Sequence, residues 1–264
     1  MQILFRAFLA IYLAHLLTDF VFQTHGLVEQ KRRGKLFAYF LHGLTHCLAA
    51  VILVGFFIAG STLLLRTHLV ILALSLVHVL IDFAKIGLAQ KAFVKDGAIA
   101  YISDQFLHFL SVALAAWLLA PGLPLAEVTA LLGRGRAIPS KLLVVPVIYI
   151  GVIFGGGYLI RALTRPLAEN VKLYRPENRG EPMKNAGLYI GWLERFLLLT
   201  ALLLQSPGTA GLILAAKAIA RYPEFKSEHF AEYFLIGTLL SFSIAVVGGA
   251  LLARVVLGQF RIAG

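Results

Sequence analysis

Histidine and aspartate side chains recur in pairs along the apolar N-terminal half of this chain. The stretch YLAHLLTDFVF, residues 12–22, is strongly apolar, yet it carries His15 and Asp19 four residues apart. In a helix this spacing places both side chains on one face, about 6 Å apart along the axis. An imidazole beside a carboxylate could bind a metal ion, carry a proton or form a buried hydrogen bond.

Three further apolar segments repeat this spacing. LHGLTHCL, VHVLIDFAK and SDQFLHFL each hold one pair of such side chains at i and i+4: His42 and His46, His78 and Asp82, Asp104 and His108. Lipid is the least favourable surrounding for these groups. The four polar stripes are therefore expected to face one another inside a four-helix bundle.

Histidine and carboxylate without cysteine is a ligand set suited to zinc first, and also to iron or manganese. The single Cys47 excludes an intramolecular disulfide and a cysteine-based zinc site. The candidate metal ligands are His15, His42, His46, His78, Asp82, Asp104 and His108. They would suffice for two ions, or for one ion with outer carboxylates on the histidine rings.

Two other interpretations of the cluster stay open, a proton or ion pathway and purely structural hydrogen bonding. One His–Asp pair alone would more often be an interhelical hydrogen bond, but four pairs at one depth favour metal. Asp19, Asp82 and Asp104 are the candidates for a catalytic general base.

The composition indicates an all-α, polytopic transmembrane bundle of about seven to eight membrane helices. Of the 264 residues, 59% are hydrophobic and only 14% are charged, and the mean hydropathy is +0.85. Several apolar runs approach the length that crosses a bilayer. The net charge of +11 is assigned to loops that face the cytoplasm and anionic lipid head groups, so membrane lipids and not nucleic acid are the expected partners.

The apolar runs predict a chain of membrane helices, over residues 2–24, 37–60, 68–90, 99–120, 142–162, 186–204 and 231–256, with a shorter helix over 211–222. Three parts follow: residues 1–121 form the four-helix bundle with the His/Asp cluster, 122–141 an interfacial connector, and 142–264 the C-terminal membrane helices. Basic loops at 30–35 and 90–97 predict that the cluster opens toward the cytoplasm.

Other polar side chains in the apolar segments have positions that are compatible with more than one role. Gln23, Lys85, Arg195 and Lys217 are candidates for binding substrate, although Lys85 is better explained as a lysine that snorkels to the interface. Glu194 and Lys217 are expected to neutralise each other as an intramembrane pair. Outside the cluster, the remaining histidines are expected near helix ends or in solvent: His25, His68 and His229.

The segments HLLTDFVFQ, HGLTH, HVLIDFAK and DQFLH resemble the N-terminal motifs of a bacterial membrane-protein family classed as a domain of unknown function. NAGLYIGWLERFL, AAKAIARYPEF and EYFLIGTLLSF resemble longer members of that family. This resemblance implies an integral protein of the bacterial inner membrane and supplies no activity.

A more distant similarity is to membrane-bound metal-dependent hydrolases. His15, the Thr45-His46 dipeptide and the segment from His78 to Asp82 are similar to the histidine motifs of that group. The Arg-Gly that precedes Thr-His there is absent, since HGLTH stands in its place. The leading hypothesis is therefore a membrane-embedded, metal-dependent hydrolase acting on a lipid or lipid-linked substrate near the cytoplasmic face. The alternative is a transporter coupled to protons or metal ions.

Overall fold

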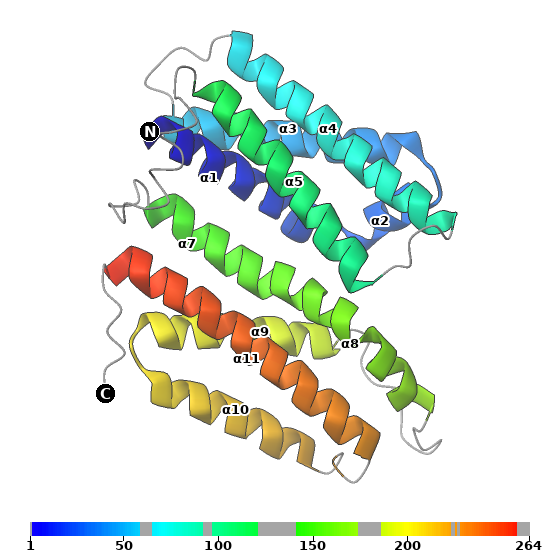
Figure 1. The fold of residues 1–264 in the computed structure, drawn as a ribbon, viewed down its shortest axis with the longest axis vertical. Helices are drawn as coiled ribbons and strands as arrows, with labels where there is room; N and C mark the ends of the chain where they lie inside the picture. The colour runs from blue at the N-terminus through cyan, green and yellow to red at the C-terminus, as the bar shows by residue number, and fades with distance from the viewer. Residues whose placement is uncertain are drawn as a thin grey trace. The chain divides into compact units, whose positions relative to one another are not determined.

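The computed structural model describes residues 2–58, 65–91, 97–120, 141–173, 186–222, 225 and 228–257, and within these ranges every regular element is a helix (Figure 1). The all-α class expected from the sequence is confirmed. The basic segment around residue 30 is a helix and not the loop that the sequence suggested.

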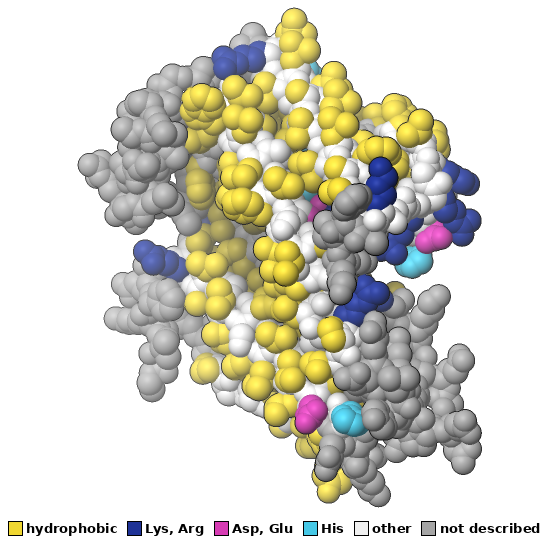
Figure 2. Space-filling model, turned by 45° about the vertical axis from the view of Figure 1, so that its right-hand side comes forward, with side chains coloured by type: hydrophobic (Ala, Val, Ile, Leu, Met, Phe, Trp, Pro, Cys, Tyr) yellow, Lys and Arg dark blue, Asp and Glu magenta, His cyan; other side chains and the backbone are white. Residues whose placement is uncertain are grey.

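Six helices among the described residues are long and apolar enough to cross a membrane: Ile3–Phe22, Leu36–Ile58, Leu65–Gln90, Ala98–Leu119, Lys141–Ala168 and His229–Leu257. The sequence suggested seven to eight. Large apolar side chains such as Phe40, Phe56 and Leu80 point outward, and Figure 2 shows hydrophobic side chains over most of the visible described surface. Length, composition and this apolar exterior indicate a multi-pass membrane protein.

Contacts divide the chain into two compact units, Met1–Val147 and Ile148–Gly264. The division falls inside helix α7 (Lys141–Ile150). The expected interfacial connector, residues 122–141, lies outside the described residues apart from Lys141.

The first unit is a ring of four helices. It contains α1 (Gln2–Leu17), the π-helical turn η1 (Thr18–Phe22), α2 (His25–Arg32), α3 (Leu36–Ile58), α4 (Leu65–Gln90) and α5 (Ala98–Leu119). Helix α1 packs against α3 and α5, and both of these pack against α4. Ala7, Ala10 and Ala14 of α1 are fully buried, and such small side chains let membrane helices approach closely. The ring encloses one interior onto which all four helices project.

Helix α2 is fastened to this ring by contacts with α3 and α4. The Thr24 side chain caps its start by accepting a hydrogen bond from the Leu27 amide at 3.3 Å. The Gln90 side chain donates to the Arg32 carbonyl, and the Tyr39 hydroxyl donates to the Lys31 carbonyl at 3.2 Å. The chain then turns at Gly34, whose φ of +73° suits glycine.

The second unit contains the π-helical turn η2 (Gly151–Gly155), α8 (Gly156–Leu173), α9 (Ala186–Leu203), α10 (Pro207–Arg221) and α11 (Glu228–Leu257). Helix α9 packs against η2, α8, α10 and α11, and is the central element of the unit. Leu198, Ala210 and Ala245 meet in its core.

Arg195 fastens α9 to the π-helical turn. Its guanidinium donates to the Ile153 carbonyl from Nε at 3.1 Å and from Nη2 at 2.8 Å, and to the Ser241 hydroxyl at 3.2 Å. A β-carbon at Gly157 would lie 2.5 Å from Nη2 of Arg195. Glycine at this position therefore makes room for a buried cation that links three helical elements.

The ion pair expected between Glu194 and Lys217 is confirmed, on helices α9 and α10. Lys217 Nζ lies 2.5 Å from Glu194 Oε2, and the side chain of Glu194 is almost completely buried. The ammonium group also lies 5.5 Å from the centre of the Phe234 ring, a favourable cation–π distance.

Replacing Gly157 with alanine should lower the stability of the second unit, because the new methyl group must displace the Arg195 guanidinium. We expect a loss of about 1–3 kcal/mol, as for other overpacked interiors, seen as a lower melting temperature of the detergent-purified protein. Gly187→Ala is the matched control, since a β-carbon there meets no atom within 4 Å, and it should leave the melting temperature unchanged or raise it. Equal effects at both positions would contradict this role of Gly157.

Glu194→Gln should destabilise the protein more than the double change Glu194→Gln with Lys217→Met. The single change leaves an ammonium group without its partner, at a cost of about 3 kcal/mol, whereas the double change removes both charges. Melting temperatures of the two variants and of Lys217→Met alone give the double-mutant cycle. Strictly additive losses would show that the two side chains do not stabilise each other.

Candidate metal centre

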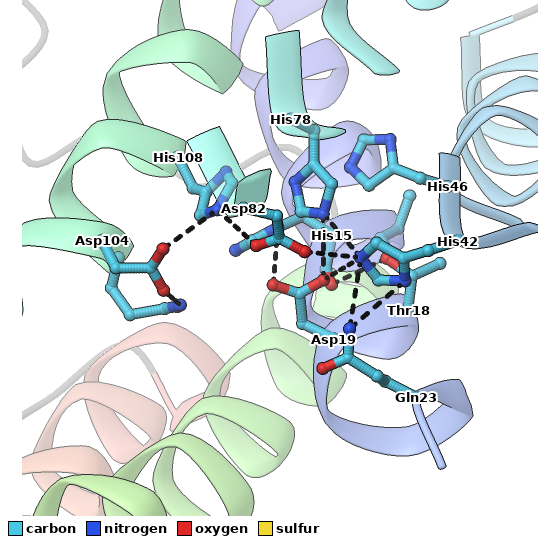
Figure 3. A network of polar contacts seen from close by, with 12 residues as sticks. His15, Thr18, Asp19, Gln23, His42, His46, His78, Asp82, Asp104 and His108 are labelled. Atoms are coloured by element: carbon cyan, nitrogen blue, oxygen red, sulfur yellow. Dashed lines mark hydrogen bonds and ion pairs between the residues drawn. The ribbon is translucent and has the colours of Figure 1, made fainter. Parts of the chain in front are cut away.

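The four-helix ring brings all four polar pairs of the N-terminal half into one interior cluster (Figure 3). We call it the His/Asp cluster, and it consists of His15 from α1, Asp19 from η1, His42 and His46 from α3, His78 and Asp82 from α4, and Asp104 and His108 from α5. The five imidazoles are between 0 and 1% exposed. Every candidate that the sequence identified as a metal ligand or a base is therefore in this cluster.

His78 lies at the centre of the cluster. Its ring centroid is 4.2 Å from that of His108, 4.4 Å from that of His46, 4.9 Å from that of His42 and 5.3 Å from that of His15. Five buried imidazoles thus share one interior space. Several imidazolium ions so close together would repel one another.

The closest approach of ligand-type atoms is between Asp19, His42 and His78. Nε2 of His42 and Nε2 of His78 are 2.8 Å apart, and each is 3.2 Å from Oδ1 of Asp19. This oxygen is buried and has no hydrogen-bond partner. Two imidazole nitrogens and a carboxylate oxygen aimed at one point form the two-histidine, one-carboxylate set that holds divalent transition metals.

The π-helical turn η1 places Asp19 at this point. The continuous helix expected over residues 2–24 instead changes at Thr18 into a wider turn and ends at Phe22. The Thr18 hydroxyl donates to the carbonyls of Ala14 and His15, at 2.9 and 3.0 Å. Single π-helical turns inside α-helices frequently occur at functional sites. The turn leaves the Oδ2 atom of Asp19 3.7 Å from Nδ1 of His15.

Gln23 follows this turn and lies at the edge of the cluster. Its amide nitrogen is 3.4 Å from both ring nitrogens of His42. It therefore contacts a candidate ligand directly, and its assignment to substrate binding stays a prediction. The contact also holds the His42 ring in place.

Lys31 is the residue of this interior that the sequence did not reveal. It belongs to the run QKRRGK, which reads as a solvated basic loop, yet its side chain is only 2% exposed. Helix α2 carries it into the ring, where Nζ lies 2.5 Å from Oδ2 of Asp82. One lysine among several neighbouring cations gives no sequence signal of this kind, because only the packing of α2 decides which of them points inward.

A second lysine pairs with a second aspartate. Lys85 Nζ lies 2.7 Å from Oδ2 of Asp104, an ion pair that the sequence did not predict, and whether this lysine snorkels to the interface stays a prediction. Its side chain is 36% exposed and forms the outer edge of the cluster. Gln105 also donates to Oδ2 of Asp104, at 3.2 Å.

His108 lies between the two lysine-bound carboxylates. Its Nε2 atom is 3.7 Å from Oδ1 of Asp82 and 3.5 Å from Oδ1 of Asp104. The cluster therefore contains a row of alternating groups, running from Lys31 through Asp82, His108 and Asp104 to Lys85. Asp82 and Asp104 in this row each have a lysine ammonium partner. The ion pairs that the structure gives Asp19 are all with histidines.

Three sets of side chains have ligand atoms within 4.8 Å of one another: Asp19 with His42 and His78, His15 with His78 and His108, and Asp82 with Asp104 and His108. Both nitrogens of His15 and Nε2 of His46 are buried and lack hydrogen-bond partners, while Nδ1 of His46 lies 3.3 Å from the Ser75 hydroxyl. Buried polar atoms in proteins are normally satisfied. Buried nitrogen atoms without hydrogen-bond partners, as in His15 and His46, are the kind of atoms that could bind a metal ion.

The remaining sequence candidates lie elsewhere. Arg195 and Lys217 belong to the second unit, where each has the partners described above, so substrate binding by either residue stays a prediction without structural support. His25, His68 and His229 are exposed, as expected from their positions near helix ends.

Comparison with known proteins gives one match. Residues 7–130 match the family described as "Protein of unknown function (DUF3307)". No curated protein and no solved structure matches the chain. A domain of unknown function thus covers the part of the chain that contains the whole His/Asp cluster.

Proposed function

We propose that the first unit binds a divalent transition metal and that the protein is a membrane-embedded, metal-dependent hydrolase. The observation that carries this proposal is the convergence of three ligand atoms on one point. Oδ1 of Asp19 is buried without a hydrogen-bond partner, 3.2 Å from two imidazole nitrogens that are themselves 2.8 Å apart. A hydrogen bond can join the two imidazole nitrogens, but it leaves Oδ1 of Asp19 without a partner, whereas buried polar atoms are normally satisfied.

Asp19, His42 and His78 are the proposed ligands. Asp82 and Asp104 each have an oxygen held by a lysine at 2.5 or 2.7 Å, which reduces their capacity to bind a cation. Asp19 has no such partner among the residues that the structure describes. Zinc suits a site of nitrogen and oxygen ligands, and iron or manganese would also fit it.

A bound divalent ion would supply Lewis-acid chemistry and a water able to attack an ester near neutral pH. The residues around it have separate tasks. Asp82 lies beside the proposed ligands, with Oδ2 3.5 Å from Nε2 of His42, and is the candidate base that accepts a proton from the attacking water. Lys31 orients this carboxylate, and His15, His46 and His108 fill the surrounding space.

The membrane setting suggests the substrate. The cluster lies within helices that are long and apolar enough to span a bilayer, so an amphipathic molecule can reach it from the lipid phase more easily than a polar one can. We infer a lipid or lipid-linked substrate in a bacterial inner membrane. The basic residues near the ends of α2 and α4, such as Arg33 and Lys91, support placing the centre near the cytoplasmic face.

A transporter coupled to protons or metal ions is the second candidate. The observation that favours it is the row of alternating acidic and basic groups from Lys31 to Lys85, which extends from a buried position to a half-exposed one. Metal-ion uptake by sealed proteoliposomes would separate the two functions, since a hydrolase retains its ion and a transporter passes it on.

Purified protein should contain about one zinc, iron or manganese ion per chain, measured by elemental mass spectrometry. His42→Ala and His78→Ala should each lose most of it, because removing one ligand leaves the coordination shell incomplete. His25→Ala is the control, since His25 is exposed and should not change the metal content. Protein that contains no metal, and binds none when zinc, iron or manganese is added, would refute the proposed centre.

Asp19→Asn and Asp104→Asn should differ in metal affinity. Asparagine keeps the shape of the side chain and removes its charge, so the first variant should bind metal at least about 100-fold more weakly. The second should stay within about tenfold of the wild type, because Asp104 lies outside the proposed ligand set. Metal titration of the apoprotein gives both values. The reverse order would move the centre to Asp82, Asp104 and His108.

A further inference from the structure

An apolar groove runs between α4 and α5 on the surface of the first unit. It has a volume of about 550 Å³. Its lining residues lie between Leu65 and Val77 in α4 and between Ser111 and Leu118 in α5, and all are aliphatic apart from Arg66 and Ser111. No residue of the His/Asp cluster belongs to this lining. The groove is therefore a feature of its own, separate from the candidate metal centre.

The groove opens outward. Leu74 and Ala115 are almost completely buried and form its floor, whereas Leu65 and Leu114 are more than half exposed and form its rims. Ala73, with a single methyl group, fills little of the space between them. Both helices are long and apolar enough to span a membrane, so the open side of the groove faces lipid. A hydrocarbon chain is the group that such a lining fits.

One end of the groove has the features of a membrane surface. Arg66, in the first turn of α4, donates from Nη2 to the carbonyl of Leu118, in the last turn of α5, at 2.8 Å. Trp117, in the same turn of α5, is 46% exposed. Tryptophan and arginine side chains of membrane helices are typically found at the level of the lipid head groups. This end of the groove therefore lies where the phosphates of a bilayer lie.

The length of the groove matches one leaflet. Helix α4 has 26 residues, and Val77, the last groove residue of this helix, stands at its midpoint. The stretch from Leu65 to Val77 rises about 18 Å. The hydrocarbon core of a bilayer is about 30 Å thick, so one leaflet contributes about 15 Å. The groove thus extends from the membrane surface to the middle of the bilayer, which is the depth that one acyl chain occupies.

Arg66 supplies the charge at the mouth of the groove. Its side chain is exposed, and the structure gives its guanidinium a neutral partner, the Leu118 carbonyl, and no ion pair with a carboxylate of the described residues. A guanidinium carries five N–H donors in a planar fork that matches the oxygens of a phosphate. A cation at head-group level, next to an apolar groove of acyl-chain length, is complementary to a phospholipid.

We propose that the groove between α4 and α5 is a phospholipid-binding site, in which Arg66 binds the phosphate and one acyl chain lies against Ala73 and Leu74. The lipid is a bound ligand between two helices of the ring, and it is distinct from any substrate of the His/Asp cluster. The cluster residues of α4, His78 and Asp82, belong to the other half of this helix. Metal-free protein should therefore bind the lipid with unchanged affinity.

The test is a lipid titration of the detergent-purified full chain, followed by native mass spectrometry. The probe is dioleoyl phosphatidylglycerol. Dioleoylglycerol has the same chains without the phosphate, and glycerol 3-phosphate has the phosphate without the chains. The phospholipid should bind at least about tenfold more tightly than either, because it alone combines charge-assisted hydrogen bonds with apolar contact. One phospholipid per chain should be retained under conditions that remove the others.

Variants with matched controls locate this lipid. Ala73→Phe and Leu114→Trp enlarge exposed lining residues, and each should weaken phospholipid binding at least about tenfold by occupying the groove. Leu76→Phe is the control, since Leu76 is exposed on the same helix but does not line the groove. Arg66→Gln should weaken binding to a similar degree. Lys91→Gln removes the same charge at an exposed position beyond the other end of α4, and should leave binding unchanged.

Three results would overturn the proposed lipid site. The first is equal binding of dioleoylglycerol and the phospholipid, because Arg66 would then hold no phosphate. The second is an equal response to Ala73→Phe and Leu76→Phe in variants that melt at the wild-type temperature, because the retained lipid would then lie outside the groove. The third is a dimer that Ala73→Phe dissociates, which would assign the groove to a second copy of the chain.

Discussion

The cost of placing charge inside an apolar helical bundle governs the first unit. A charged side chain in the middle of a membrane costs about 3 kcal/mol or more, and three aspartates share this interior. Two of them are neutralised by lysines, Asp82 by Lys31 and Asp104 by Lys85. Asp19 has histidines around it, and a divalent cation would supply the missing positive charge. Helix α2 packs against the ring and brings Lys31 inward, where its ammonium group neutralises Asp82.

The ring of helices and the cluster depend on each other. Four helices with polar stripes at the same depth can bury those stripes only against one another, and the small side chains of α1 allow the close approach that this requires. The second unit meets the same constraint with different pairs. Arg195 is satisfied by the Ile153 carbonyl and Ser241, and Lys217 by Glu194. It thus forms a helical unit with its own buried charges.

The sequence predicted the helical class and the membership of the cluster because both follow from local spacing. Two polar residues at i and i+4 in an apolar segment lie on the same face of a helix. Four such polar faces can avoid lipid only by packing against one another. The sequence did not reveal Lys31, since all the cations of QKRRGK look alike until α2 packs. The sequence also did not predict that Lys85 forms an ion pair with Asp104, because its position alone is equally compatible with a side chain that extends to the interface. The π-helical turn at Thr18–Phe22 likewise has no sequence signature, although it positions Asp19.

An anomalous-scattering map of the metal-loaded protein, recorded at the absorption edge of the bound ion, tests the central claim most directly. The account predicts one strong peak in the first unit, about 2.0–2.2 Å from Oδ1 of Asp19 and from Nε2 of His42 and His78, the distances usual for zinc bound by carboxylate and imidazole. A peak beside Asp104 and Lys85, or no peak within the ring of helices, would contradict it.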